Sequence, residues 1–247
     1  MRVIIIEDEA IIRDGIAALI DWQAEGFEEL YTYGNVIDAL EDMEKLDIDL
    51  ILTDIFMPVL SGLEFIEMAK ELQPDTLFVI LTGHERFEYA QKAIELGVQQ
   101  YLLKPINPKK LLNTVRKAVK DIKERNKIKS WFDLEIVTTP AAKTIVNDAK
   151  KIINENYTDA EISVRKIASR LNITPSYLSR IFRNNADKTC VEYLTSRRLN
   201  AAKKLLRNSS IKSYEIAEMV GYNNPHYFSA LFKKHTGLSP REFREER

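Results

Sequence analysis

Acidic, hydroxyl and ammonium side chains end four short apolar runs in the first half of this 247-residue sequence. Glu7 and Asp8 follow the first run, and Asp54, Thr82 and Lys104 end three others. Clustered carboxylates repel one another unless a cation neutralises them. Oxygen ligands without histidine or cysteine nearby favour Mg²⁺, which also binds phosphate oxygens. The pattern therefore predicts a Mg²⁺ site suited to phosphate chemistry.

These residues meet only if the apolar runs are parallel strands of one sheet. We expect strands at residues 2–6, 28–32, 50–53, 77–81 and 100–103. Helical patterns lie near residues 10–20, 35–46, 62–71, 86–96 and 108–125. This alternation favours an α/β domain over residues 1–122, with a parallel sheet covered on both faces and ligands beyond the strand ends. A single acidic residue there often only caps a helix, but five positions at one edge favour a shared site.

The second half, residues 141–247, shows helical periodicity and no strand pattern, so we expect an all-α domain. It contains a weak internal repeat, because Ile167-Ala168 recurs as Ile216-Ala217 and Tyr177-Leu178-Ser179 recurs as Tyr227-Phe228-Ser229. Each copy is predicted to form a helix, a tight turn and a second helix, which is a helix-turn-helix unit.

Turn chemistry supports both units. Thr174 and Asn224 each precede a proline, which is typical of a capping residue followed by the first helical position. Gly221 stands where the preceding helix must stop. A long helical pattern over Val191–Arg207 would hold the two units at a fixed separation. Their second helices could then enter successive major grooves of DNA, roughly 34 Å apart.

Charge divides the chain in the same way. Residues 1–122 carry 12 Lys and Arg against 23 Asp and Glu, whereas residues 123–247 carry 24 against 14. An acidic half joined to a basic half is expected when one end meets a polyanion. We interpret residues 123–140 as a partly helical linker, because a basic helical stripe continues to about residue 131 and Thr138-Thr139-Pro140 indicates a break.

Cysteine use and hydropathy narrow the class of protein. The single cysteine, Cys190, excludes an intramolecular disulfide and a cysteine-based zinc cluster, and we interpret it as a small buried residue. No apolar run approaches the roughly 20 residues that span a bilayer, and no signal segment is apparent. We expect a cytoplasmic protein with no membrane partner.

The first half resembles the receiver domain of two-component response regulators over nearly its full length. The motifs that carry the resemblance are Glu7-Asp8, Asp54 with Met57-Pro58 and Gly62, Thr82-Gly83, and Tyr101-Leu102-Leu103-Lys104-Pro105. The resemblance implies a flavodoxin-like, doubly wound five-stranded sheet. It also implies that Asp54 accepts a phosphoryl group from a sensor histidine kinase.

The same resemblance assigns roles around Asp54. Mg²⁺ would be held by Glu7, Asp8, Asp54 and the backbone carbonyl of Phe56. Lys104 would pair with the phosphoryl oxygens, and Thr82 and Tyr101 would form the switch that responds to the new charge. Two positions tune the lifetime of the phosphoaspartate in this family, and here they are Phe56 and His84. Because Phe56 cannot hold a water by hydrogen bonding, we expect slow self-dephosphorylation.

The second half resembles the AraC-type DNA-binding domain over about 105 residues. Its anchors include Pro175-Ser176-Tyr177-Leu178-Ser179-Arg180-Ile181-Phe182, Arg198 with Ala201-Ala202 and Leu205-Leu206, Val220-Gly221-Tyr222, and Gly237-Leu238-Ser239-Pro240. The apolar members are expected to pack rather than bind: Ile167, Leu178, Phe182, Ile216, Phe228 and Phe232. The DNA-facing set is Ser176, Ser179, Arg180 and Arg183 on the first recognition helix, and Asn224, His226, Tyr227, Ala230, Lys233 and Lys234 on the second.

Arg180 is the best candidate to read a base, because a guanidinium can bind guanine O6 and N7 together. Two positions depart from the family pattern. Ala230 stands where the family often carries Arg or Lys, so the second helix is expected to read DNA by apolar contact. Asp187 replaces a usual glycine after the first recognition helix, and aspartate tolerates the left-handed conformation better than most residues.

The leading interpretation is a transcription factor controlled by phosphorylation of Asp54, with double-stranded DNA as partner and a homodimer formed on phosphorylation or on DNA. A constitutive DNA-binding protein with a degenerate receiver is the main alternative. A haloacid-dehalogenase-type phosphatase is a third, but it needs a general acid two residues after the nucleophile, where Phe56 stands. We therefore expect no turnover enzyme, only a receiver that catalyses its own phosphoryl transfer and dephosphorylation.

Overall fold

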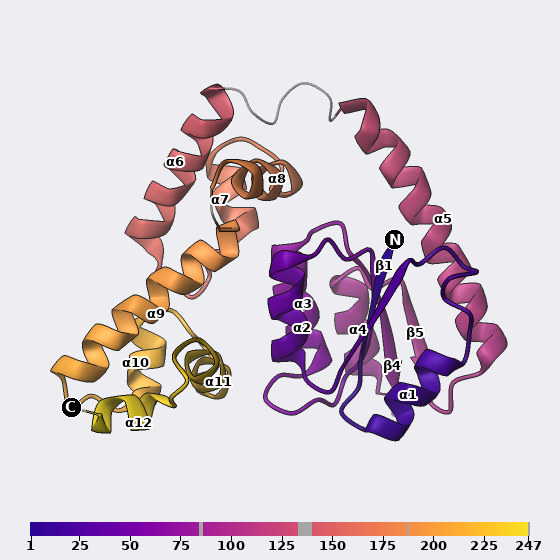
Figure 1. Ribbon diagram of the computed structural model, residues 1–247, viewed down its shortest axis with the longest axis horizontal. Helices are drawn as coiled ribbons and strands as arrows, with labels where there is room; N and C mark the ends of the chain where they lie inside the picture. Colours follow the sequence, from indigo (N-terminus) through magenta and orange to yellow (C-terminus); the bar gives the residue numbers. More distant parts are fainter. Residues whose placement is uncertain (84–85, 133–139, 187, 247) are drawn as a thin grey trace. The chain divides into compact units, whose positions relative to one another are not determined.

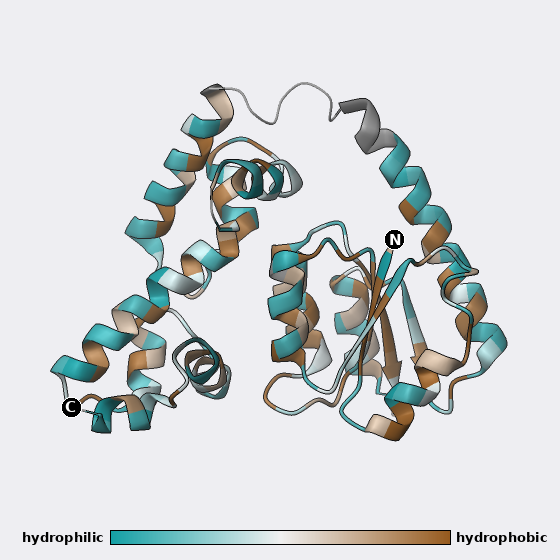
Figure 2. Ribbon diagram, viewed as in Figure 1, coloured by the Kyte–Doolittle hydropathy of each residue, from teal (hydrophilic) through white to brown (hydrophobic). Residues whose placement is uncertain are grey.

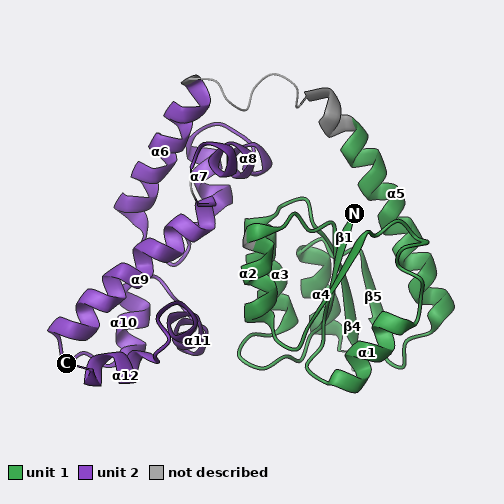
Figure 3. Ribbon diagram, in the orientation of Figure 1, with its two compact units in different colours: residues 1–135 green, residues 136–247 purple. Residues whose placement is uncertain are grey.

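The computed structural model describes residues 1–83, 86–132, 140–186 and 188–246 (Figure 1). The chain forms two compact units, Met1–Glu135 and Ile136–Arg247, coloured separately in Figure 3. Within the described residues, none of the helices combines the length and apolar character needed to cross a membrane.

Unit 1 contains a five-stranded parallel sheet in the order β2-β1-β3-β4-β5. The strands are β1 (Arg2–Ile6), β2 (Glu29–Tyr33), β3 (Leu50–Asp54), β4 (Leu77–Thr82) and β5 (Gln100–Leu103). The expected doubly wound α/β fold is confirmed, and β2 lies one residue later than predicted. Strands β1, β3 and β4 are mostly apolar, and brown segments run through the sheet in Figure 2. Val3, Ile4, Ile5 and Ile6 are fully buried because helices cover both faces.

Five helices accompany the sheet. They are α1 (Ala10–Ala18), α2 (Val36–Lys45), α3 (Gly62–Leu72), α4 (Phe87–Glu95) and α5 (Pro108–Phe132). Helix α1 ends two residues earlier than expected. The chain turns there because Trp22 enters the core, where its Nε1 donates to the Ala17 carbonyl at 2.9 Å and its ring meets Phe27 edge-on.

Helix α5 stays attached to the sheet beyond residue 122, where we predicted that the domain ends. Arg125 donates to the backbone carbonyl of Asp75, and Gln99 donates to Asp121. These bonds tie α5 to the loops before β4 and β5. The predicted linker therefore begins within a helix of unit 1, and its residues 133–139 lie outside the described part of the chain.

The described residues of unit 2 form helices joined by turns, with no strand among them, as predicted. Its helices are α6 (Pro140–Asn156), α7 (Val164–Arg170), α8 (Pro175–Asn185), α9 (Cys190–Asn208), α10 (Ser213–Met219), α11 (Pro225–Thr236) and α12 (Pro240–Glu245). Helices α7 and α8 form the first helix-turn-helix unit, and α10 and α11 form the second. The long helix α9 connects them.

The two turns have the predicted chemistry. The Thr174 hydroxyl accepts from the Tyr177 amide at 3.2 Å and caps α8. The Asn224 side chain accepts from the amides of His226 and Tyr227 at 3.0 Å and caps α11. Gly221 has φ +93°, a left-handed conformation that glycine adopts without steric cost.

Each helix-turn-helix unit has its own hydrophobic core. The first core includes Ile167, Leu178 and Phe182, together with Cys190. The second core includes Ile216, Phe228 and Phe232. The six residues expected to pack are each at most 1% exposed, and Cys190 is buried, so these predictions are confirmed.

Candidate functional site

Four strand ends meet at one edge of the sheet in unit 1. Glu7 follows β1, Asp54 ends β3, Thr82 ends β4, and Lys104 follows β5. Parallel registry keeps these ends level, since Ile6 pairs with Thr53 and Asp54 pairs with Leu81. The Lys104 amide donates to the Thr82 carbonyl at 2.7 Å, which extends the pairing past β5.

Lys104 forms the centre of this cluster. Its ammonium lies 2.6 Å from Asp54 Oδ2 and 2.6 Å from Glu7 Oε2. The other oxygen of Asp54, Oδ1, accepts hydrogen bonds from the backbone amides of Ile55 and Phe56. Glu7 is fully buried and Asp54 is 7% exposed, so three charged side chains share a nearly dry site. One cation cannot neutralise two carboxylates, which leaves the cluster with a net negative charge.

Burial and ion pairing act on the site in opposite directions. Burial raises the pKa of Glu7, and the bond to Lys104 offsets only part of that rise. Burial lowers the pKa of Lys104, but its bonds to Asp54 and Glu7 outweigh burial and leave that pKa above its usual value. The ammonium therefore stays charged, while burial disfavours ionisation of the Glu7 carboxyl.

The donor set fits a hard cation. Glu7 Oε1 is buried and has no hydrogen-bond partner among the described residues. A buried carboxylate oxygen without a partner is expensive, and a divalent cation would satisfy it. Asp8 is exposed beside Glu7. In the described part of the chain, no three carboxylate, histidine or cysteine side chains are already grouped as metal ligands.

The remaining residues predicted for the receiver site differ in burial. Thr82 is fully buried, and Tyr101 on β5 is half-buried. Phe56 is 43% exposed, and its ring meets Tyr89 of α4 edge-on, with 5.4 Å between centroids. His84 lies outside the described residues.

Two residues that shape the site were given no role from the sequence alone. Arg13 on α1 donates to the Glu7 backbone carbonyl at 2.7 Å and holds the loop that carries Asp8. Gly62 begins α3 directly against Asp54, and a Cβ added there would lie 1.9 Å from the Asp54 carbonyl oxygen. Gly62 was part of a recognised motif, but the reason for a glycine lies in a contact across the loop.

The polar residues of α8 differ in accessibility. Ser176, Arg180 and Arg183 are half-buried, and the Arg180 guanidinium lies 5.7 Å from the centroid of the Tyr177 ring. The Ser179 hydroxyl is buried and has no hydrogen-bond partner within the part of the chain that the structure describes. All four α8 residues expected to face DNA are thus only partly exposed, and the Ser179 hydroxyl itself is buried. Asp187, after this helix, is outside the described residues.

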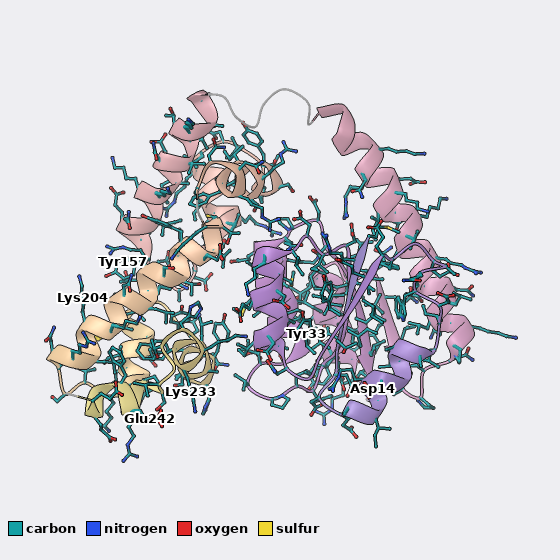
Figure 4. The ribbon with its side chains drawn as sticks, in the orientation of Figure 1. Asp14, Tyr33, Tyr157, Lys204, Lys233 and Glu242 are labelled. Atoms are coloured by element: carbon teal, nitrogen blue, oxygen red, sulfur yellow. The ribbon has the colours of Figure 1, made fainter. Side chains whose placement is uncertain are left out.

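Helix α11 is capped at its N-terminus and carries exposed basic side chains along its length. Asn224 already uses its side-chain oxygen in the cap, and the Tyr227 ring lies 6.0 Å from Tyr222 in the second core. His226, Lys233 and Lys234 are exposed, and Lys233 is labelled on this helix in Figure 4. Ala230 is half-buried among them.

Comparisons with known proteins agree with both units. A model of the response regulator receiver domain matches residues 3–116, and a model of a helix-turn-helix domain matches residues 167–246. The chain is 29% identical to the transcriptional regulatory protein HptR of Staphylococcus aureus over 249 residues, which cover 98% of this chain and 97% of HptR. It is also 29% identical over 251 residues to an uncharacterized response regulatory protein of Staphylococcus epidermidis, covering 99% and 98% of the two chains. Among solved structures, the chain is similar to the receiver domain of AraT, a response regulator from Geobacillus stearothermophilus, with 36% identity and a TM-score of 0.48. The match covers 51% of this chain and 97% of the AraT domain.

Proposed function

The chain is a response regulator that joins a receiver domain to an AraC-type helix-turn-helix domain, and we propose that Asp54 is the residue through which it is switched. The observation that carries this proposal is the contact of Lys104 with Asp54 and Glu7 at the sheet edge. Its function is two-component regulation of transcription, in which a sensor histidine kinase is the phosphate donor and DNA is the target.

The transfer is a nucleophilic substitution at phosphorus. An oxygen of the Asp54 carboxylate attacks the phosphoryl group of the kinase phosphohistidine, the P–N bond breaks, and its electron pair leaves with the imidazole. The product is an acyl phosphate on Asp54. Lys104 offers its ammonium to the new phosphoryl oxygens, since it already contacts the attacking side chain.

Mg²⁺ is the cofactor we propose for this step, and it would neutralise charge on the phosphoryl group. Glu7, Asp8, Asp54 and the Phe56 carbonyl are the residues that would hold it. Glu7 Oε1, which has no hydrogen-bond partner within the described part of the chain, supports this assignment. Thr82 and Tyr101 are proposed to report the new phosphate to the surface of the receiver, and the active form is proposed to be a homodimer.

A turnover enzyme is not supported. The position two residues after Asp54 is Phe56, whose ring cannot donate a proton to a leaving group. We therefore propose a regulator that acts in the cytoplasm and whose only chemistry is its own phosphorylation and dephosphorylation. The alternative of a degenerate receiver is disfavoured because Asp54 and Lys104 are present and in contact.

In the second domain, we propose that Arg180 reads a base while Ser176, Ser179 and Arg183 line the same groove. His226, Tyr227, Ala230 and Asn224 would face the second groove, with Lys233 and Lys234 on the phosphates. The exposure of both lysines supports the last assignment. Phosphate contacts of this kind add affinity that falls with salt and is blind to sequence.

Intact-protein mass spectrometry after incubation with acetyl phosphate and Mg²⁺ tests the phosphoacceptor. We expect a gain of about 80 Da in the wild type, the mass of one phosphoryl group. Asp54→Asn should abolish this gain, whereas the matched change Asp14→Asn, on the exposed surface of α1, should preserve it. A gain that persists in Asp54→Asn would refute the assignment, and no gain in the wild type would favour the degenerate receiver.

A further inference from the structure

Arg198, in the middle of α9, is a buried cation that the receiver and DNA assignments leave unused. It is 8% exposed although it carries a full charge, and a buried guanidinium requires partners. Its Nε donates to the Tyr157 carbonyl at 2.8 Å, and its Nη2 donates to the Asp159 carbonyl at 2.9 Å. Both acceptors lie just after α6 ends, where a cation is favoured by the helix dipole.

The same guanidinium also contacts the second helix-turn-helix unit. It lies 5.1 Å from the ring centroid of Tyr222, which is buried in the second core. Tyr157 belongs to the first helix-turn-helix unit, since it packs against the first core of unit 2. Figure 4 labels it near the end of α6. Arg198 therefore bonds to the backbone of one unit and stacks on a core residue of the other.

Gly221 closes this junction from the side of α10. A Cβ at Gly221 would lie 2.7 Å from the Tyr157 carbonyl oxygen and 2.9 Å from Arg198 Nη2. A glycine is therefore required at this point both for its positive φ and for the space that the Arg198 guanidinium occupies.

The position of Arg198 along α9 gives this contact its importance. The first core uses α9 up to Leu194, and the second core uses it from Leu199 onward. The two cores share no residue among those described, so α9 and the contacts at Arg198 connect them. A single helix between two separate cores can bend, whereas a three-way contact at its midpoint resists bending.

From these contacts we propose that Arg198 is a positioning residue for DNA recognition, which sets the angle between recognition helices α8 and α11. The fixed angle determines the spacing that a two-part DNA site must have. This inference rests on the proposed DNA-binding function, although its geometric part is measured without DNA.

Double electron–electron resonance on the full chain tests whether Arg198 fixes the angle between α8 and α11. Nitroxide labels at Asn184→Cys on α8 and His235→Cys on α11, with Cys190→Ser, occupy exposed sites on the two recognition helices. We expect one narrow distance distribution in the wild-type background and a distribution at least about twice as wide in Arg198→Met, because two linked bodies regain relative freedom. Arg197→Met is the matched control, since the neighbouring Arg197 stacks on the ring of Tyr157, which packs against the first core, and its distribution should stay narrow.

Two further variants allow a loss of positioning to be distinguished from a loss of folding. Arg198→Lys keeps the charge but loses the planar fork that reaches two carbonyls, and Gly221→Ala crowds the same junction from the other side. Circular dichroism identifies which variants are folded. A narrow distribution in every folded variant would overturn the proposal, because Arg198 would then only stabilise the fold.

The DNA part uses duplexes that the full-length protein selects from a random library. Inserting one base pair between the two protected segments rotates one relative to the other by about a tenth of a turn. We expect the wild type and Arg197→Met to lose at least about tenfold in affinity, and Arg198→Met to lose less than about threefold, because loosely linked units tolerate a change of spacing. Equal losses in all three proteins would contradict the role of Arg198 in spacing. Failure of the wild type to select any duplex would instead refute DNA binding, while the distance measurements would still decide the role of Arg198.

Discussion

Gly62 packs so closely on Asp54 that a Cβ at Gly62 would lie 1.9 Å from the Asp54 carbonyl oxygen and 2.9 Å from its carbonyl carbon. The Gly62 amide donates to the Ile55 carbonyl at 2.8 Å, so α3 begins on the backbone that carries the phosphoacceptor. The backbone of Asp54 cannot yield easily, because the same strand is bonded to β1 and β4. The position of the acidic site thus depends on the absence of a side chain at Gly62.

Gly62→Ala should therefore damage both stability and phosphorylation. We expect a loss of about 1–3 kcal/mol in the free energy of unfolding, as for other overpacked sites, and slower phosphorylation by acetyl phosphate. Urea unfolding and mass spectrometry measure the two effects. Gly15→Ala on α1 is the control, since a Cβ there meets no described atom within 4 Å. A Gly62→Ala protein with wild-type stability and phosphorylation would contradict the close packing.

Much of this site could be predicted because its chemistry lies at strand ends. Runs such as Val3–Ile6 identify a strand by composition, and a parallel sheet brings Glu7, Asp54 and Lys104 to one edge. The length of α1 was overestimated because the pattern does not reveal that Trp22 leaves the helix for the core.

The unpredicted features are contacts between residues far apart in the chain. Arg198 meets carbonyls about forty positions earlier, and backbone acceptors carry no sequence signature. Arg13 also donates to a backbone carbonyl without a sequence signature, that of Glu7, although this residue is only six positions earlier. Helical periodicity could place Arg198 on α9, but only the packing of two separate cores shows why a cation is buried there.

Glu7 is expected to lower the free energy of unfolding of the cation-free protein, although its carboxylate would help to bind the cation. Its pKa is raised by burial, so the folded chain binds its proton more tightly than the unfolded chain does, and stability falls as pH rises above the usual value of 4.5. Glu7→Gln should therefore be more stable than the wild type at pH 7, by about 1–2 kcal/mol, while Lys104 keeps its bond to Asp54.

The advantage of Glu7→Gln should shrink as pH falls toward 4.5, because the folded wild-type carboxyl takes up its proton before the unfolded one does. Thermal unfolding over a pH series measures this difference. Added Mg²⁺ should raise the Tm of the wild type more than that of Glu7→Gln, since a ligand stabilises only the state that binds it. A variant that is less stable at pH 7 would show that the ion pair with Lys104 outweighs burial.

Val59, in the loop after Asp54, has φ +75°, which is strained for a β-branched residue. Val59→Gly should remove this strain and stabilise the chain by about 0.5–1 kcal/mol, after the greater flexibility of unfolded glycine is subtracted. Val59→Ala keeps a Cβ and hence most of the strain, so it serves as the control. Urea unfolding would contradict the expectation if both variants were equally stable.

Phe56 is expected to slow hydrolysis of the phosphoaspartate. Its ring is held edge-on by Tyr89 and offers no hydrogen bond to a water near Asp54. Phe56→Asn should shorten the lifetime at least about tenfold, because a polar group can orient the attacking water. Tyr89→Ala should shorten it less, and Phe87→Ala, at an 82% exposed position of α4, should leave it unchanged. Loss of the phosphoryl mass over time gives the rates, and a wild-type half-life of only seconds would refute slow dephosphorylation.

Substitution of Arg180 should distinguish base-specific recognition from nonspecific electrostatic attraction to DNA. Its guanidinium lies over the Tyr177 ring, one turn earlier on α8, which restricts its motion before DNA binds. Arg180→Ala should cost about 1–3 kcal/mol on the selected duplex and relax preference at one base pair, whereas Lys233→Ala should weaken all duplexes equally and reduce the salt dependence. Competition binding on selected and random duplexes at two salt concentrations separates these effects. An equal loss on both duplexes for Arg180→Ala would place its contact on phosphate, and the reading of bases would then fall to other residues of the recognition helices.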